Sequence, residues 1–229
     1  MPFTPQTLDF LAENKLRNDK QWYQEHKPQF KQNVFEPLAE LVTQLAPVIH
    51  EIDPMLIAEP KTGKSISRVF RDTRFTKDPS LFREEMWCVF TRDKKAYTSA
   101  PGFFFELSPD GFRYGCGYFD APPKVMDAMR TLILKRDKSF LTAKQVYEKQ
   151  DVFQMEGDFY KRVRYPEQPQ DIQDWLQRKG ISFNHNSKDF NLLFSPELHR
   201  TVARHFRLLA PVYALFLRVR LLLLEETGV

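Results

Sequence analysis

The sequence predicts an α+β fold, in which a mostly antiparallel central sheet is packed against helices from both ends of the chain. Helical periodicity near both ends, strand-like apolar runs between residues 66 and 119, and one clear β-hairpin support this prediction. Of the 229 residues, 42% are hydrophobic, which is ample for a core without disulfides or metals. No repeat or low-complexity linker divides the chain, so we expect a single domain over residues 1–229.

The N-terminal part of the chain is predicted to be helical. Thr4-Pro5 has the pattern of an N-cap followed by proline at the first helical position, and Asn18-Asp19 can cap a second helix. Over residues 22–52, apolar side chains recur every three or four positions, as on one face of a helix. Three prolines interrupt this face, and proline kinks a helix. We therefore expect one long bent helix or two abutting helices.

Strands are predicted in the middle of the chain, at residues 66–71, 86–91, 103–107 and 112–119. The last two are separated by Ser108-Pro109-Asp110-Gly111. Proline presets the backbone at the first turn position, and Asp-Gly supplies the conformations that a tight turn requires. These two strands therefore form a β-hairpin. Further helices are expected at 121–135, at 172–179 and from Ser195 onward, with a bend near Pro211, while residues 137–165 give no clear pattern.

Two glycines, Gly115 and Gly117, occupy one face of the second hairpin strand. A glycine weakens a strand and often marks the close approach of another backbone or of a ligand. Two interpretations remain open here: a helix packs tightly against the strand, or the glycines form the floor of a ligand site.

The charge distribution directs attention to residues 61–83. The whole chain has a formal charge of +4, but this segment alone holds seven basic and two acidic residues, an excess of +5. Arginine offers five donors in a planar fork that suits phosphate or carboxylate. A concentrated positive field also attracts anions. We therefore expect a small anionic ligand, such as a phosphorylated compound, to bind here.

The predicted ligand-binding residues combine this segment with the two hairpin glycines: Arg68, Arg71, Asp72, Arg74, Lys77, Arg83, Gly115 and Gly117. Asp72 can orient an arginine. If the protein is an enzyme, Asp72 is also the candidate base, with arginines to stabilise negative charge. Nothing in the sequence decides whether a reaction is catalysed.

Two alternatives to a small-ligand site remain. In the first, the protein is a non-catalytic interaction module, and Asp72 and Asp78 form salt bridges that only stabilise a turn. In the second, nucleic acid binds to the basic segment together with a stripe of arginines on the last helix. The members of this stripe are Arg200, Arg204 and Arg207. Nucleic acid ranks last, because a solvated helix face accounts for the stripe.

Several functional classes are not supported by motifs. Residues 58–65 resemble a relaxed Walker A loop, but the first glycine is replaced by Ala58, Pro60 lacks an N–H group, and a strand is predicted to follow instead of a helix. The five histidines are scattered and show no metal-ligand spacing. Signatures of hydrolases and metalloproteases are missing. We therefore expect no metal and no cofactor.

No secretion signal or membrane span is predicted. The N-terminal sequence MPFTPQTLDF has no basic stretch followed by an apolar one. The apolar stretch 208–224 is short and is interrupted by Arg218 and Arg220. Cys88 and Cys116 have no metal-binding spacing, so we expect buried, reduced thiols. These observations predict a cytoplasmic protein without a membrane partner.

Four segments resemble motifs of the family called domain of unknown function 2461. They are residues 18–23, residues 68–78, the second hairpin strand through Tyr118, and the helix that reaches Arg130. Together they span roughly residues 3–135, and a looser similarity continues around Trp175 and in the last helix. The resemblance implies a bacterial-type cytoplasmic protein and supplies no established activity, cofactor or catalytic residue.

The chain departs from the family pattern in two places. After Asp78 the family has Lys-Ser-Pro-Tyr-Lys, whereas this chain has Pro-Ser-Leu-Phe followed by Arg83. A lysine and a tyrosine hydroxyl are therefore lost, and Arg83 replaces the second lysine. Near the later strand, Asn186-Ser187 stands where the family has Arg-Pro.

Overall fold

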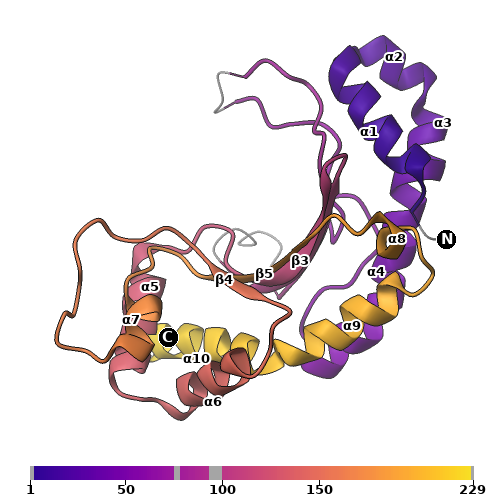
Figure 1. The fold of residues 1–229 in the computed structure, drawn as a ribbon. Coiled ribbons are helices and arrows are strands. Elements are labelled where there is room, and N and C mark those ends of the chain that lie inside the picture. Colours follow the sequence, from indigo (N-terminus) through magenta and orange to yellow (C-terminus); the bar gives the residue numbers. More distant parts are fainter. Residues whose placement is uncertain (1–2, 75–77, 93–99, 228–229) are drawn as a thin grey trace. The chain divides into compact units, whose positions relative to one another are not determined.

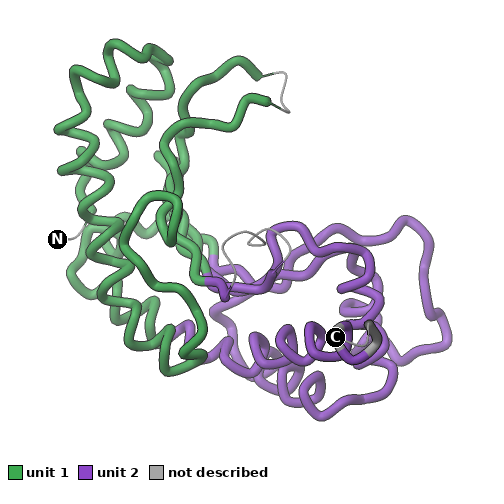
Figure 2. Tube along the Cα trace, turned by 180° about the vertical axis from the view of Figure 1, so that it is seen from behind, with its two compact units in different colours: residues 1–90, 104–114, 186–204 green, residues 91–103, 115–185, 205–229 purple. Residues whose placement is uncertain are grey.

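The computed structural model describes residues 3–74, 78–92 and 100–227 (Figure 1). Helices occupy both ends of the chain, and the strands between them form a five-stranded antiparallel sheet, which confirms the α+β prediction. Two compact units make up the fold (Figure 2). Unit 1 contains residues 1–90, 104–114 and 186–204, and unit 2 contains residues 91–103, 115–185 and 205–229. The single domain over residues 1–229 stays a prediction.

The sheet has the strand order β1-β2-β3-β5-β4. Its strands are β1 (Met86–Thr91), β2 (Gly102–Ser108), β3 (Gly111–Gly117), β4 (Gln154–Glu156) and β5 (Ser182–Ser187). The predicted strands 86–91, 103–107 and 112–119 are thus confirmed as β1, β2 and β3, with small shifts at their ends. β4 and β5 run antiparallel, with Met155 opposite Phe183.

The turn between β2 and β3 consists of Pro109 and Asp110, as the sequence predicts. Gly111 follows it with φ of 149°, a conformation that residues with a side chain rarely adopt. A Cβ atom at this position would also lie 2.5 Å from the carbonyl oxygen of Ser187. Glycine is therefore required here for two reasons: the backbone conformation after the turn, and the close approach of Ser187, the last residue of β5.

The predicted strand 66–71 is wrong as a regular strand. This segment pairs with the chain just before and within β1 only through isolated antiparallel bridges at Ile66 and Phe70. Ser67 donates its N–H to the Trp87 carbonyl (2.9 Å), and its hydroxyl accepts the Trp87 N–H (3.1 Å). A side chain thus takes the place of a backbone acceptor, and this substitution interrupts the ladder.

The N-terminal helices of unit 1 follow one another closely. They are α1 (Pro5–Arg17), α2 (Lys20–Glu25), α3 (Lys27–Phe30), a π-helical turn η1 (Lys31–Phe35) and α4 (Glu36–Ile52). Thr4 forms a capping box with Thr7, and Asp19 accepts the Trp22 N–H at 2.8 Å, as their positions in the sequence predict. Prolines begin α3 and α4, so the long apolar face is divided into several helical segments.

The remaining helices lie in the second half of the chain. They are α5 (Pro123–Leu134), α6 (Lys138–Glu148), α7 (Gln170–Leu176), α8 (Phe190–Leu193), α9 (Leu198–Leu208) and α10 (Ala210–Thr227). The expected bend near Pro211 is the break between α9 and α10. Among the described residues, no helix is both long enough and apolar enough to cross a membrane.

Each unit has an aromatic core. In unit 1, the rings of Phe3 and Phe105 stack with centroids 5.9 Å apart. In unit 2, the Phe103 ring lies 4.9 Å from that of Phe206, and the Trp175 ring lies 5.4 Å from that of Phe183. Aromatic pairs at these distances add to the free energy gained by burial.

Candidate functional site

The basic segment of unit 1 is held by the N-terminal motif. Asn18 ends α1 in the left-handed conformation (φ 49°), and its side-chain oxygen accepts the Leu81 N–H at 2.6 Å. The buried ring of Tyr23 packs against Phe70 and Phe82, with centroids 5.3 and 5.2 Å away. Burial raises the pKa of Tyr23. Two of the segments that resemble the family motifs, residues 18–23 and residues 68–78, are therefore connected. Residues 18–23 contact both flanks of the loop 71–81.

Both acidic residues of the segment are engaged by its own arginines. Arg71 forms an ion pair with Asp78, which also accepts the Ser80 N–H at 2.9 Å. Arg74 donates to both carboxylate oxygens of Asp72, at 2.9 and 2.6 Å. This bidentate geometry is the stronger form of an Arg–carboxylate pair, although both partners are exposed here.

Asp72 is poorly suited to act as a base at neutral pH. The hydrogen bonds from Arg74 lower its pKa from 3.8 to about 2. A general base works best when its pKa lies near the working pH. The geometry therefore favours the interpretation that Asp72 orients Arg74.

Arg83 differs from the other arginines of the segment. Its guanidinium carbon lies 4.6 Å from the centroid of the Trp87 ring, a cation–π distance. Its Nε is buried and has no hydrogen-bond partner among the described residues. Its charge contributes to the lowered pKa of Asp72, so the guanidinium lies in the field of the Asp72–Arg74 pair. Arg83 therefore keeps an unused donor beside two paired arginines.

The other predicted site residues are not shown to gather around Arg83. Arg68 is exposed and forms no ion pair with a described residue. Lys77 lies outside the described residues. Gly115 and Gly117 belong to unit 2, whereas the described part of the basic segment belongs to unit 1. A pocket shared by at least three of the five predicted cations stays a prediction.

The two hairpin glycines are explained by the neighbouring strand. A Cβ atom on Gly115 would lie 2.0 Å from the carbonyl oxygen of Phe183, and one on Gly117 would lie 2.5 Å from the Cβ of Ser182. Phe183 and Ser182 belong to β5, so the close approach is that of a strand backbone and not of a helix. This contact accounts for both glycines without a ligand.

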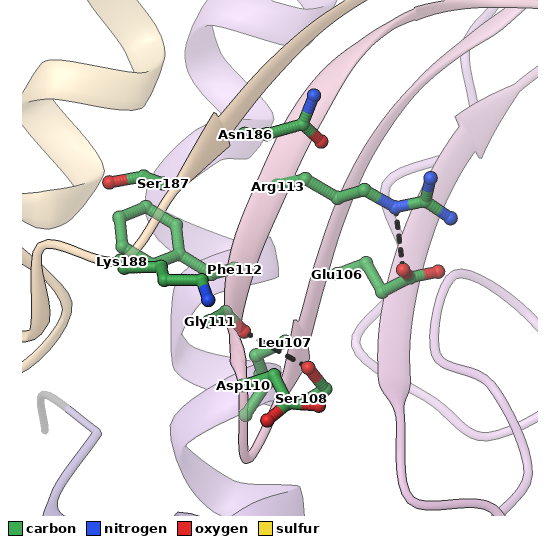
Figure 3. A pocket seen from close by; sticks show the side chains of 10 residues that line it. All are labelled: Glu106, Leu107, Ser108, Asp110, Gly111, Phe112, Arg113, Asn186, Ser187 and Lys188. Atoms are coloured by element: carbon green, nitrogen blue, oxygen red, sulfur yellow. Dashed lines mark hydrogen bonds and ion pairs between the residues drawn. The ribbon is translucent and has the colours of Figure 1, made fainter.

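A pocket of about 310 Å³ lies in unit 1 at the β2–β3 turn and the end of β5 (Figure 3). Its lining consists of Glu106, Leu107, Ser108, Asp110, Gly111, Phe112, Arg113, Asn186, Ser187 and Lys188. Arg113 donates to Glu106 at 2.6 Å, and Lys188 is exposed at the other side of the turn. The pocket has charged groups of both signs and therefore no strong preference for an anion.

This pocket was not predicted from the sequence, although the sequence contains one signal for it. A two-residue turn sets the register of a hairpin, so Glu106 must stand opposite Arg113. No such signal places residues 186–188 in the pocket lining, because their position depends on which strand pairs with β3. In the described ranges, no group of three or more His, Cys, Asp or Glu side chains is arranged to hold a metal.

Comparison with known protein families gives one match. The family model described as "Conserved hypothetical protein (DUF2461)" matches residues 6–214. All four segments quoted for the resemblance lie within the matched range. No curated protein matches the chain.

Proposed function

Because the chain belongs to the conserved hypothetical DUF2461 family and the basic segment lies inside the matched range, we propose that this segment binds a small anionic ligand. The ligand carries a phosphate or carboxylate group, and Arg83 is its central contact. The buried thiols Cys88 and Cys116 support a reducing, cytoplasmic location for this function.

The observation that carries the proposal is the buried Nε of Arg83, which has no partner in the described part of the chain. A buried donor without an acceptor costs about 1–3 kcal/mol. A ligand oxygen that accepts this N–H group removes that cost. The Trp87 ring limits the freedom of the guanidinium, so less entropy is lost when an anion binds.

The paired arginines support this role indirectly. Both carboxylates of the segment form ion pairs with other arginines, Asp78 with Arg71 and Asp72 with Arg74, and Arg83 receives only the longer-range field of Asp72. Arg68 adds an exposed positive charge on the same segment. The described residues 68–83 therefore keep a net positive charge although each acid is paired.

The same ion pairs favour a second candidate function, that of a non-catalytic interaction module. In this alternative, Arg71–Asp78 and Arg74–Asp72 only fix the conformation of the loop. The two candidates differ in one measurable respect. A structural cluster gives no saturable binding of phosphate, whereas an anion site does.

The test is isothermal titration of inorganic phosphate and pyrophosphate into wild type, Arg83→Gln and Arg83→Lys. We expect saturable binding by wild type, loss of at least about tenfold in affinity for Arg83→Gln, and partial recovery for Arg83→Lys. Arg200→Gln is the matched control, because Arg200 is an exposed arginine with an ion pair to Glu197 at 2.7 Å. No binding by wild type, with normal melting of all variants, would support the structural alternative.

A further inference from the structure

Unit 2 carries a second concentration of cations and aromatic rings, in the loop between β4 and α7 (Figure 1). Its central sequence is Phe159-Tyr160-Lys161-Arg162-Val163-Arg164-Tyr165. This central sequence lies in the region 137–165 that showed no clear pattern, and the proposed anion site of unit 1 does not involve it.

Cations of this loop lack acidic partners. Two nearby carboxylates are engaged by buried arginines: Asp127 pairs with Arg130, and Asp174 pairs with Arg178. The two acids of the loop itself, Asp158 and Glu167, form no ion pair with a described residue. Within the described ranges, no ion pair is formed by Lys161, Arg162 or Arg164 of the loop, or by Lys179, which follows α7. Like charges held together on a surface repel one another until an anion approaches.

Two of these cations gather at one aromatic ring. The guanidinium carbon of Arg164 lies 4.7 Å from the centroid of the Tyr160 ring, and the Nζ of Lys179 lies 6.0 Å from it. Lys161 and Arg162 are exposed beside them. The positive charge is therefore concentrated on one short stretch of unit 2.

Apolar side chains are exposed on the same loop. Phe159 is 49% exposed and Val163 is 69% exposed. The guanidinium carbon of Arg178 lies 4.4 Å from the centroid of the Phe159 ring and supports it from the protein side. Aromatic residues and arginine next to exposed apolar groups are typical of protein–protein interfaces.

The loop is held in a defined conformation by hydrogen bonds. The Tyr160 N–H donates to the Gln177 carbonyl at 2.9 Å. The side-chain amide of Gln177 donates to the carbonyl of Arg164, and that of Gln173 donates to the carbonyl of Tyr165. A loop fixed before binding loses less conformational entropy when it meets a partner.

We propose that this loop is the docking surface for an acidic segment of a partner protein that also carries apolar side chains. The unpaired cations match the acidic groups, and Phe159 and Val163 match the apolar ones. Single-stranded nucleic acid fits these observations less well, because bases stack on open ring faces. Arg178 occupies one face of the Phe159 ring, and Tyr160 is half-buried with Arg164 against it.

The test uses fluorescence anisotropy with a short fluorescein-labelled peptide of glutamates and phenylalanines. Its two comparison probes are the same peptide with glutamine for glutamate, and a single-stranded oligothymidylate. We expect wild type to bind the acidic peptide with a Kd below about 1 mM and to bind the glutamine peptide at least about tenfold more weakly. Val163→Ser is expected to lose about threefold in affinity.

The decisive variant is Lys161→Glu/Arg162→Glu, since both side chains are exposed and unpaired, so the fold should tolerate the change. We expect it to lose at least about tenfold in affinity for the acidic peptide. The matched control is Lys124→Glu/Lys138→Glu, which changes the charge equally at the first turns of α5 and α6, where acidic residues are tolerated. Equal losses in both variants, no peptide binding by wild type, or tighter binding of oligothymidylate would overturn the proposal.

Discussion

Asn18 offers the sharpest test of how the N-terminal motif fixes the basic segment. Its side-chain oxygen accepts the Leu81 N–H at 2.6 Å across 63 residues of chain, and its backbone is left-handed. Three substitutions separate these two roles. Asn18→Gly removes the acceptor but tolerates the backbone conformation, Asn18→Ala loses both, and Asn18→Asp keeps both.

The expected magnitudes follow from this geometry. Leaving the Leu81 N–H without an acceptor costs about 1–3 kcal/mol. Forcing alanine into the left-handed region costs about 1 kcal/mol more. We therefore expect the free energy of unfolding to fall by about 1–3 kcal/mol for Asn18→Gly and by about 2–4 kcal/mol for Asn18→Ala. The melting temperature of Asn18→Ala should then fall by roughly 5–15 °C.

The assay is urea unfolding of the three variants and wild type, followed at the tryptophan fluorescence. Phosphate titration at a temperature where each variant is folded reports whether the loop 71–81 keeps its conformation. If Asn18→Gly and Asn18→Ala both unfold within about 0.5 kcal/mol of wild type, the bond to Leu81 does not hold the segment. In that case, the hydrogen bond between Asn18 and Leu81 does not contribute measurably to the free energy of unfolding.

Three further predictions concern the sheet, the thiols and pH. Gly115→Ala should lower the free energy of unfolding by about 1–3 kcal/mol, because the added Cβ meets the backbone of β5. Gly180→Ala, with open space around its Cβ, should change the free energy of unfolding little, and urea unfolding of both variants tests the difference. Cys88 and Cys116 should react slowly with a thiol reagent in folded protein, because both are buried and burial raises the pKa of Cys116; fast reaction of both would contradict this core. The pKa of Asp72 is lowered from 3.8 to about 2, so its contribution to stability is present above pH 3.8 and is lost as the pH falls through about 2. The melting temperatures of wild type and Asp72→Asn, measured from pH 7 to pH 2, should therefore become equal only at the acidic end.

The parts of the fold that were predictable depend on local chemistry. The Pro109-Asp110 turn sets the hairpin, and Thr4 and Asp19 set the starts of α1 and α2. The segment 66–71 has the composition of a strand, but the Ser67 hydroxyl bonds to Trp87 and breaks the ladder. A pattern of apolar residues does not reveal this competition between a side chain and the backbone.

The candidate sites were predictable only in part, because they depend on contacts between distant segments. Sequence composition identified the basic segment. It could not show which arginine pairs with which carboxylate, because that depends on the conformation of the backbone. Strand order decides that β5 fills the space beside Gly115. The loop around Tyr160 has no periodicity, since side-chain amides of Gln173 and Gln177 hold its backbone.

The most direct test of the central claim observes the Nε–H group of Arg83 itself. Its resonance in a ¹H–¹⁵N NMR spectrum can be assigned by its loss in Arg83→Lys, and phosphate is then titrated into wild type. An anion that accepts this N–H group should shift the resonance in a saturable way, while the Nε–H of Arg200, on its exposed ion pair, stays in place. A stationary Arg83 resonance at saturating phosphate, or an equal shift of Arg200, would contradict the anion site.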